Sequence, residues 1–180
     1  MRGLLFLRLL CCIGICCFAC EAAGIMEALT TEKLTRASKM VILGEVEDLK
    51  SQWSETGEKI ITRATVTITR VIRGKSASKQ LIVEYDGGEV GGIGLKVSDV
   101  SPLRKREQVL LFLRPKDADD GPDVFNIVGR AQGKYTIHEN GVARKSGFVV
   151  AGERSEMDNN IPLEALIQKI RAVATENLKE

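Results

Sequence analysis

A glycine-rich segment holds the residues of this chain best suited to cradle an anion. Gly87, Gly88, Gly91 and Gly92 lie within six positions of one another. Backbone amides beside glycines can line an anion site, because no side chain blocks the approach. Their spacing matches neither the dinucleotide-binding fingerprint nor the phosphate-binding loop of nucleotide hydrolases. We keep these glycines as candidate binding residues, and the alternative is a structural loop that crosses one end of the fold.

Trp53 is the only tryptophan, and we place it in a loop near the tip of a predicted first hairpin. An indole ring there can stack on a sugar or a base, or anchor a protein partner. The alternative is that the ring pins its own loop onto the fold. The sequence leaves both roles open.

The residues that could support catalysis stand in no recognisable arrangement. Asp86 and Glu89 are a carboxylate pair of the kind that glycosidases use, but nothing in the sequence sets their separation. His138 is the only histidine, and it has no candidate nucleophile or carboxylate at a recognisable spacing. We expect a surface histidine, a protein that is not an enzyme, and no cofactor.

An acidic segment superficially resembles a calcium-binding loop. Such loops place glycine at the sixth position, whereas Gly121 is the fifth residue counted from Asp117. We therefore predict an exposed acidic turn and no metal. Its carboxylates are Asp117, Asp119, Asp120 and Asp123.

The first 20 residues are typical of a signal peptide. Arg2 and Arg8 flank the apolar run Leu9 to Ala19, which ends among small residues. A membrane-spanning helix needs about 20 apolar residues, and this run is shorter. We expect residues 1–20 to direct export, with the mature chain beginning at or just after Cys20, which makes the protein periplasmic, envelope-associated or secreted.

All five cysteines lie in or at the end of this leader. Cys20 directly follows Ala19, so it is a candidate for lipidation, although Phe18 and Cys17 depart from a bacterial lipobox. A lipid on Cys20 is the one membrane attachment that we expect, and the alternative is ordinary cleavage after Ala19 or Ala22. The mature chain then holds at most one thiol, so no intramolecular disulfide stabilises it.

The charges balance once the leader is removed. The chain has 26 Lys and Arg residues and 24 Asp and Glu residues, and Arg2 and Arg8 account for the difference. Nucleic-acid binding needs a basic excess on one face. We therefore expect no nucleic-acid partner.

Hydrophobic periodicity predicts a strand-rich domain over residues 39–152 between two helices. Strict alternation from Ile60 to Ile72 indicates a long half-buried strand, with Val66 facing inward and Thr67 outward. Val109 to Leu113 is apolar on both faces, as a central strand would be. Residues 25–38 read as a short helix, and an apolar stripe over residues 160–178 predicts an amphipathic helix packed on the strands. The expected fold is mainly β: a small antiparallel barrel, like that of oligonucleotide- and oligosaccharide-binding (OB) proteins.

The residues also carry a resemblance over about Leu29 to Ile137. Its segments are Met40 to Val46, Trp53, Ile60 to Gly74, Gly87 to Gly94, Glu107 to Leu113, and Gln132 to Lys134. They resemble a group of uncharacterised exported bacterial proteins, which implies an exported β domain without known chemistry. Their strand order is distantly similar to the barrel of tissue inhibitors of metalloproteinases. Those inhibitors use a free N-terminal cysteine and a disulfide set, and here Cys20 would have no partner cysteine.

The function expected from these features is an exported, non-catalytic module that binds an unknown envelope protein or a glycan. The alternatives are a structural envelope lipoprotein, a protease-inhibitor-like protein or a hydrolase.

Overall fold

Strands make up most of the computed structural model, which describes residues 25–116, 123–151 and 157–176. The leader, Cys20 and all of the acidic segment except Asp123 lie outside the described residues. Within the described part, no helix is both long and apolar enough to cross a membrane. In chain order the elements are β1 (Ile25–Glu27), α1 (Thr31–Ala37), β2 (Met40–Trp53), β3 (Ile60–Arg73), β4 (Gln80–Asp86), β5 (Gly88–Val90), β6 (Ile93–Leu95), β7 (Gln108–Pro115), β8 (Val124–Ile127), η2 (Arg130–Gly133), β9 (Lys134–Ile137), β10 (Val142–Arg144), β11 (Val149–Ala151), β12 (Ile161–Pro162) and α2 (Leu163–Glu176).

Five strands close into a small barrel in the order β7-β2-β3-β4-β8, and β8 pairs with β7 to complete the ring. The predicted mainly β barrel, with a short helix before it and a helix after it, is confirmed. The strand orientation is mixed, because β4 and β8 run parallel whereas the other four pairs of the barrel are antiparallel. A closed ring with an odd number of strands cannot alternate direction all the way round, so at least one neighbouring pair must be parallel.

A long, bent hairpin of β2 and β3 forms one side of the barrel. Its register shifts between Val41 and Ile42, Leu43 and Gly44, and Val46 and Asp48, and such irregularities bend a strand. One of these shifts lies at Gly44, and a glycine inside a strand often marks such a bulge. Trp53 lies at the end of β2 opposite Ile60, not in a loop as predicted, because backbone pairing continues after the apolar pattern of β2 has stopped.

The barrel interior is filled by alternate residues of its strands. Val66 is completely buried, whereas Thr67 is partly exposed and its hydroxyl accepts a hydrogen bond from the Gln80 side chain. The predicted faces of β3 are therefore confirmed at these positions. The inner core consists of Met40, Ile42, Val46, Ala64, Val66, Leu81, Val83, Leu103, Val109, Leu111, Leu113 and Phe125.

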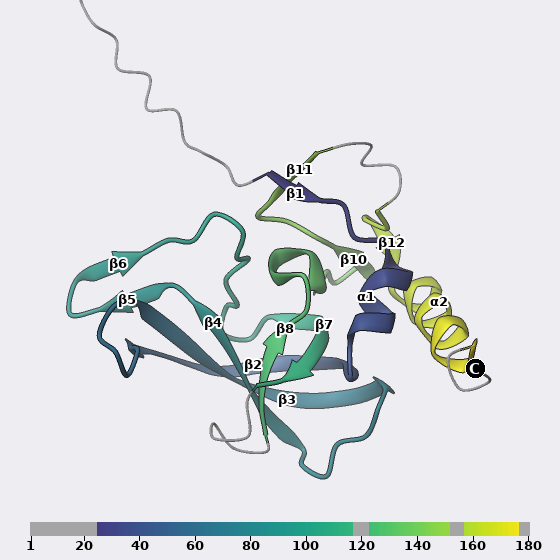
Figure 1. Cartoon of the computed structure of the whole chain (residues 1–180). Helices are drawn as coiled ribbons and strands as arrows, with labels where there is room; N and C mark the ends of the chain where they lie inside the picture. The colour runs from purple at the N-terminus through teal and green to yellow at the C-terminus, as the bar shows by residue number, and fades with distance from the viewer. Residues whose placement is uncertain (1–24, 117–122, 152–156, 177–180) are drawn as a thin grey trace, which may run out of the picture.

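A second core covers the outer face of β7. Leu110 and Phe112 pack there against Leu34 of α1 and against one face of α2. In Figure 1 the two helices lie beside each other at one side of the barrel, and the β5–β6 hairpin extends from the opposite side. β7 is thus buried on both faces, as its sequence predicts. The residues of α2 in this core are Leu166, Ile167 and Ile170.

Both helices begin later than the sequence predicts. Thr30 caps α1, since its hydroxyl accepts a hydrogen bond from the Lys33 amide at 3.2 Å. The chain before it forms β1, which pairs in parallel with β11. Residues 161–162 pair with β10 as β12, and α2 therefore begins at Leu163.

Candidate functional site

A polar groove lies on the outer surface of the barrel, beside β4, β7 and β8. Its volume is about 240 Å³. The β2–β3 loop contributes Lys59, and the segment between β6 and β7 contributes Val100 and Ser101. The other lining residues are Glu84, Tyr85, Asp86, Arg114, Lys116, Asn126, Ile127 and Arg130.

Strand register brings one polar residue from each of four strands into a row across this surface. Arg63 of β3 pairs with Glu84 of β4, Glu84 with Asn126 of β8, and Asn126 with Arg114 of β7. Each of the four has one residue of the inner core directly beside it in its strand, and these residues are Ala64, Val83, Phe125 and Leu113. Because side chains alternate between the two faces of a strand, the row points away from the barrel interior.

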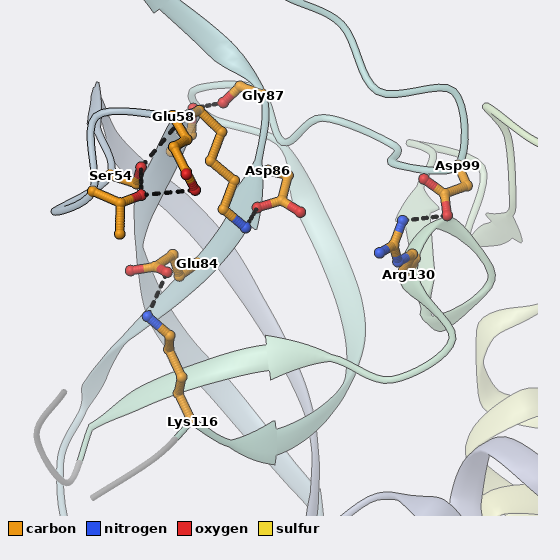
Figure 2. Close-up of polar contacts among 11 residues, drawn as sticks. Ser54, Glu58, Glu84, Asp86, Gly87, Asp99, Lys116 and Arg130 are labelled. Atoms are coloured by element: carbon orange, nitrogen blue, oxygen red, sulfur yellow. Dashed lines mark hydrogen bonds and ion pairs between the residues drawn. The ribbon is translucent and has the colours of Figure 1, made fainter. Parts of the chain in front are cut away.

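Glu84 anchors the groove. Its side chain is only 7% exposed, and its carboxylate accepts hydrogen bonds from Arg63 Nε at 2.8 Å and from Lys116 Nζ at 2.6 Å. Figure 2 shows Lys116 extending from the end of β7 to this carboxylate. A buried carboxylate needs such partners, because desolvation strongly penalises an unpaired charge. The three side chains therefore hold β3, β4 and β7 together beneath the groove.

Two further ion pairs lie at the rim. Lys59 Nζ is 2.7 Å from an Asp86 carboxylate oxygen, and Arg130 pairs with Asp99 (Figure 2). Both pairs include an exposed member, so each contributes little to stability, on the order of 1 kcal/mol or less. Their effect is to orient the long basic side chains along the edge of the groove.

The groove has a local excess of positive charge. Four basic residues line it, Lys59, Arg114, Lys116 and Arg130, whereas its acidic residues are Glu84 and Asp86. Both carboxylates are already paired with basic side chains. Arg114 is exposed, and within the described residues no hydrogen bond or ion pair holds its guanidinium. The groove can therefore offer a planar fork of N–H donors to an anion.

A second pocket of about 470 Å³ lies on the other side of the segment that contains Ser101. Lys134 there is 4% exposed and donates to Glu107 at 2.9 Å and to the Pro102 carbonyl at 2.6 Å. The alternation of Lys134 with Tyr135 predicts that Lys134 shares a polar face with His138. That prediction is wrong for Lys134, because Glu107 pairs with it inside the fold. Burial lowers the pKa of Lys134, and the nearby Glu107 opposes that shift. His138 is exposed, as expected, and lines the pocket.

The predicted glycine site does not form part of the charged groove. Gly87 and Gly88 line a neighbouring pocket of about 210 Å³, which shares Tyr85, Asp86 and Val100 with the groove. Gly91 and Gly92 form the turn between β5 and β6 with φ angles of +59° and +80°. A Cβ added at Gly88 would lie 2.3 Å from Thr62 Oγ1. These positions thus require glycine for backbone geometry, and a binding role for them stays a prediction.

The remaining predicted residues are also dispersed. Trp53 is 42% exposed and lines neither the charged groove nor the second pocket, so its role as an anchor or a pin stays a prediction. Asp86 joins the groove, whereas Glu89 lies outside it on β5. Within the described ranges, no group of three or more His, Cys, Asp or Glu side chains is placed to hold a metal ion.

The charged residues of the row across the groove were not predicted from the sequence. Arg63 and Glu84 stand at outward positions of two strands, a pattern that an exposed strand face also produces. Opposite charges on β3 and β4 are a usable signal only when the register of the two strands is known.

Neither a protein-family model nor a curated protein matches the chain. The fold and the groove define its class directly: a small closed five-stranded β-barrel, flanked by two helices, with a positively charged groove on its outer surface.

Proposed function

We propose that this protein is an exported, non-catalytic binding module, and that its groove binds the acidic part of an envelope glycan. The observation that carries the proposal is the state of the charges in the groove. Glu84 and Asp86 are paired within the protein, and Arg114 is left to meet an external anion. An arginine fork matches a carboxylate with two parallel hydrogen bonds.

The barrel geometry supports a glycan as the ligand. Numbered within the barrel, β2, β3, β4, β7 and β8 are strands one to five, paired in the order 1-2-3-5-4. We infer an OB-type barrel, a class that binds oligosaccharides or oligonucleotides on strands two and three and on the adjoining loops. Arg63 and Glu84 lie on those strands here, and Lys59 comes from the loop between strands one and two. The resemblance to exported bacterial proteins is consistent with this proposal.

The arrangement of the carboxylates favours binding over hydrolysis. A glycosidase needs one carboxyl group to donate a proton and a second to act as a base or nucleophile. Both groove carboxylates instead accept hydrogen bonds from lysine or arginine side chains, so both are already engaged within the protein.

Calorimetric titration with oligogalacturonate, and with a neutral galactose oligomer of the same length, tests the proposal. We expect the acidic oligomer alone to bind, and Arg114→Ala to weaken its binding by about 10-fold or more, the value of a charged hydrogen bond. Arg171→Ala, on the exposed face of α2, is the matched control and should bind normally.

Equal binding of the two oligomers, or the same affinity in Arg114→Ala, would contradict the proposed role of the groove. Cleavage of either oligomer during the titration would contradict a non-catalytic function.

A further inference from the structure

The segment between β6 and β7 separates the groove from the second pocket, and the two meet at Ser101, which lines both. The second pocket continues from Ser101 to Arg104, Arg144 and His138. Basic side chains are therefore found on both sides of this segment. We call the segment, residues 96–107, the ridge.

The charges of the second pocket repeat those of the groove. Its carboxylate, Glu107, accepts hydrogen bonds from Lys134 Nζ, from Thr136 Oγ1 and from the Arg104 backbone amide. Arg104 and His138 are exposed, and among the described residues no hydrogen bond or ion pair holds the Arg104 guanidinium. Like the groove, the second pocket therefore has a carboxylate that is paired within the protein, Glu107, and an arginine, Arg104, whose guanidinium has no partner among the described residues.

Hydrogen bonds hold the ridge to several other elements of the fold. Lys134 Nζ donates to the Pro102 carbonyl at 2.6 Å, the Ala131 amide to the Asp99 carbonyl at 3.0 Å, and the Arg106 amide to the Val46 carbonyl at 2.7 Å. The Lys134 donor lies on β9, the Ala131 donor lies in η2, and the Val46 acceptor lies on β2. A ligand that crosses the ridge therefore meets a preorganised surface and loses little free energy in ordering it.

We infer that the groove and the second pocket form one extended site, and that an acidic glycan crosses the ridge between them. This inference rests on the proposed function. A linear polymer with a carboxylate on each sugar can place one acid at Arg114 and another at Arg104. The joined site then gains affinity with chain length, because the second contact forms at a high effective concentration.

The lining favours a glycan over a single-stranded nucleic acid. Nonspecific binding of single strands depends on aromatic side chains on which successive bases stack. Among the described residues that line either pocket, the only aromatic side chains are those of Tyr85 and His138. The Tyr85 ring packs against the inner core. The site therefore offers charge along its length without a stacking platform.

Affinity measured over a length series of oligogalacturonates, from the monomer upward, tests the extended site. We expect affinity to rise with length until both pockets are filled. Arg104→Ala should lower the affinity for long oligomers by about 10-fold and leave the shortest bound oligomer unaffected. Arg114→Ala should weaken binding at every length. Arg171→Ala is again the control, and thermal unfolding should show that Arg104→Ala and Arg114→Ala both fold.

The outcomes separate the two proposals. If Arg104→Ala binds all lengths normally while Arg114→Ala does not, the extended site is wrong and the proposed function stands. If the wild-type protein binds no oligogalacturonate, the proposed function itself fails. Tighter binding of an oligodeoxynucleotide of matched charge would overturn the glycan as the ligand of both pockets.

Discussion

Two buried charges in this protein are accommodated in different ways. Glu84 is neutralised by direct contacts with Arg63 and Lys116. Lys145 is 3% exposed, and its ammonium has no hydrogen-bond partner among the described residues; it lies 4.6 Å from the centre of the Tyr135 ring. A cation over an aromatic face is stabilised by roughly 2 kcal/mol when desolvated, which offsets only part of the cost of burial. Lys145 is therefore a source of pH-dependent stability.

Burial lowers the pKa of Lys145 to about 8, with Asp158 raising it and Lys169 lowering it. In the unfolded chain a lysine has its ordinary pKa of about 10.4. Between these values the unfolded state holds a proton that the folded state has lost, so stability should rise with pH from about 8 to about 10. Two pKa units correspond to roughly 3 kcal/mol. Above about pH 10 stability should fall again, because burial raises the pKa of Tyr135 and only the unfolded tyrosine ionises.

Urea unfolding of Lys145→Met across this pH range checks the effect. The variant should lose most of the rise in the free energy of unfolding, with the buried Lys134 contributing the remainder, and Lys33→Met, an exposed lysine on α1, should keep the whole rise. A rise of the same size in Lys145→Met would show that another group causes it.

At the scale of elements, β3 shows how far a local pattern determines structure. Burial alternates strictly from Thr62 to Val66, but Val71 contacts the inner core and Ile72 the second core. The register shifts of β2 against β3 explain this change, because a bulge moves later side chains to the other face. Periodicity therefore predicted the faces over the first half of β3 and not at its end.

The two faces of β3 should respond differently to the same charge. Val66→Asp buries an unpaired carboxylate in the barrel and should lower the free energy of unfolding by several kcal/mol. Thr67→Asp replaces a partly exposed residue that makes one hydrogen bond with Gln80, so its cost should be roughly 1 kcal/mol or less. Urea denaturation of both variants gives the comparison. Losses of equal size would contradict the inward orientation of Val66.

At the scale of the whole molecule, the barrel and the helices share β7. Its inward residues belong to the inner core, and its outward residues pack under α1 and α2. The second core covers one face of the barrel wall, so the two cores should unfold together.

Ile170→Ala tests that coupling. Ile170 is fully buried in the second core, and truncating such a side chain costs about 2–5 kcal/mol. Trp53 lies at the end of β2 and belongs to neither core, so its fluorescence reports on the barrel. We expect the fluorescence and far-UV circular dichroism transitions to shift together to lower urea. Gln168 is exposed on the same helix, and Gln168→Ala should leave both unfolding transitions at the same urea concentration as in the wild-type protein. A Trp53 transition that does not move in Ile170→Ala would show that the barrel is stable without the helix layer.

The sequence by itself determined the features that depend on near neighbours. These include the alternation of β3 around Val66 and the burial of β7 on both faces. They also include the tight turn that the dipeptide Asn140–Gly141 favours, where Gly141 has a φ of +75°. Each follows from side-chain periodicity or local backbone sterics, which a short stretch of chain expresses on its own.

The tertiary structure alone decided the candidate site. Arg63, Glu84, Asn126 and Arg114 come from four strands, and only the register of those strands places them in one row. Likewise, Lys134 is polar by residue type and alternates with the buried Tyr135, yet it is buried because Glu107 reaches it from another segment. Contacts between distant segments depend on how strands pair around the whole barrel, and that pairing is not written in the pattern of any one of them.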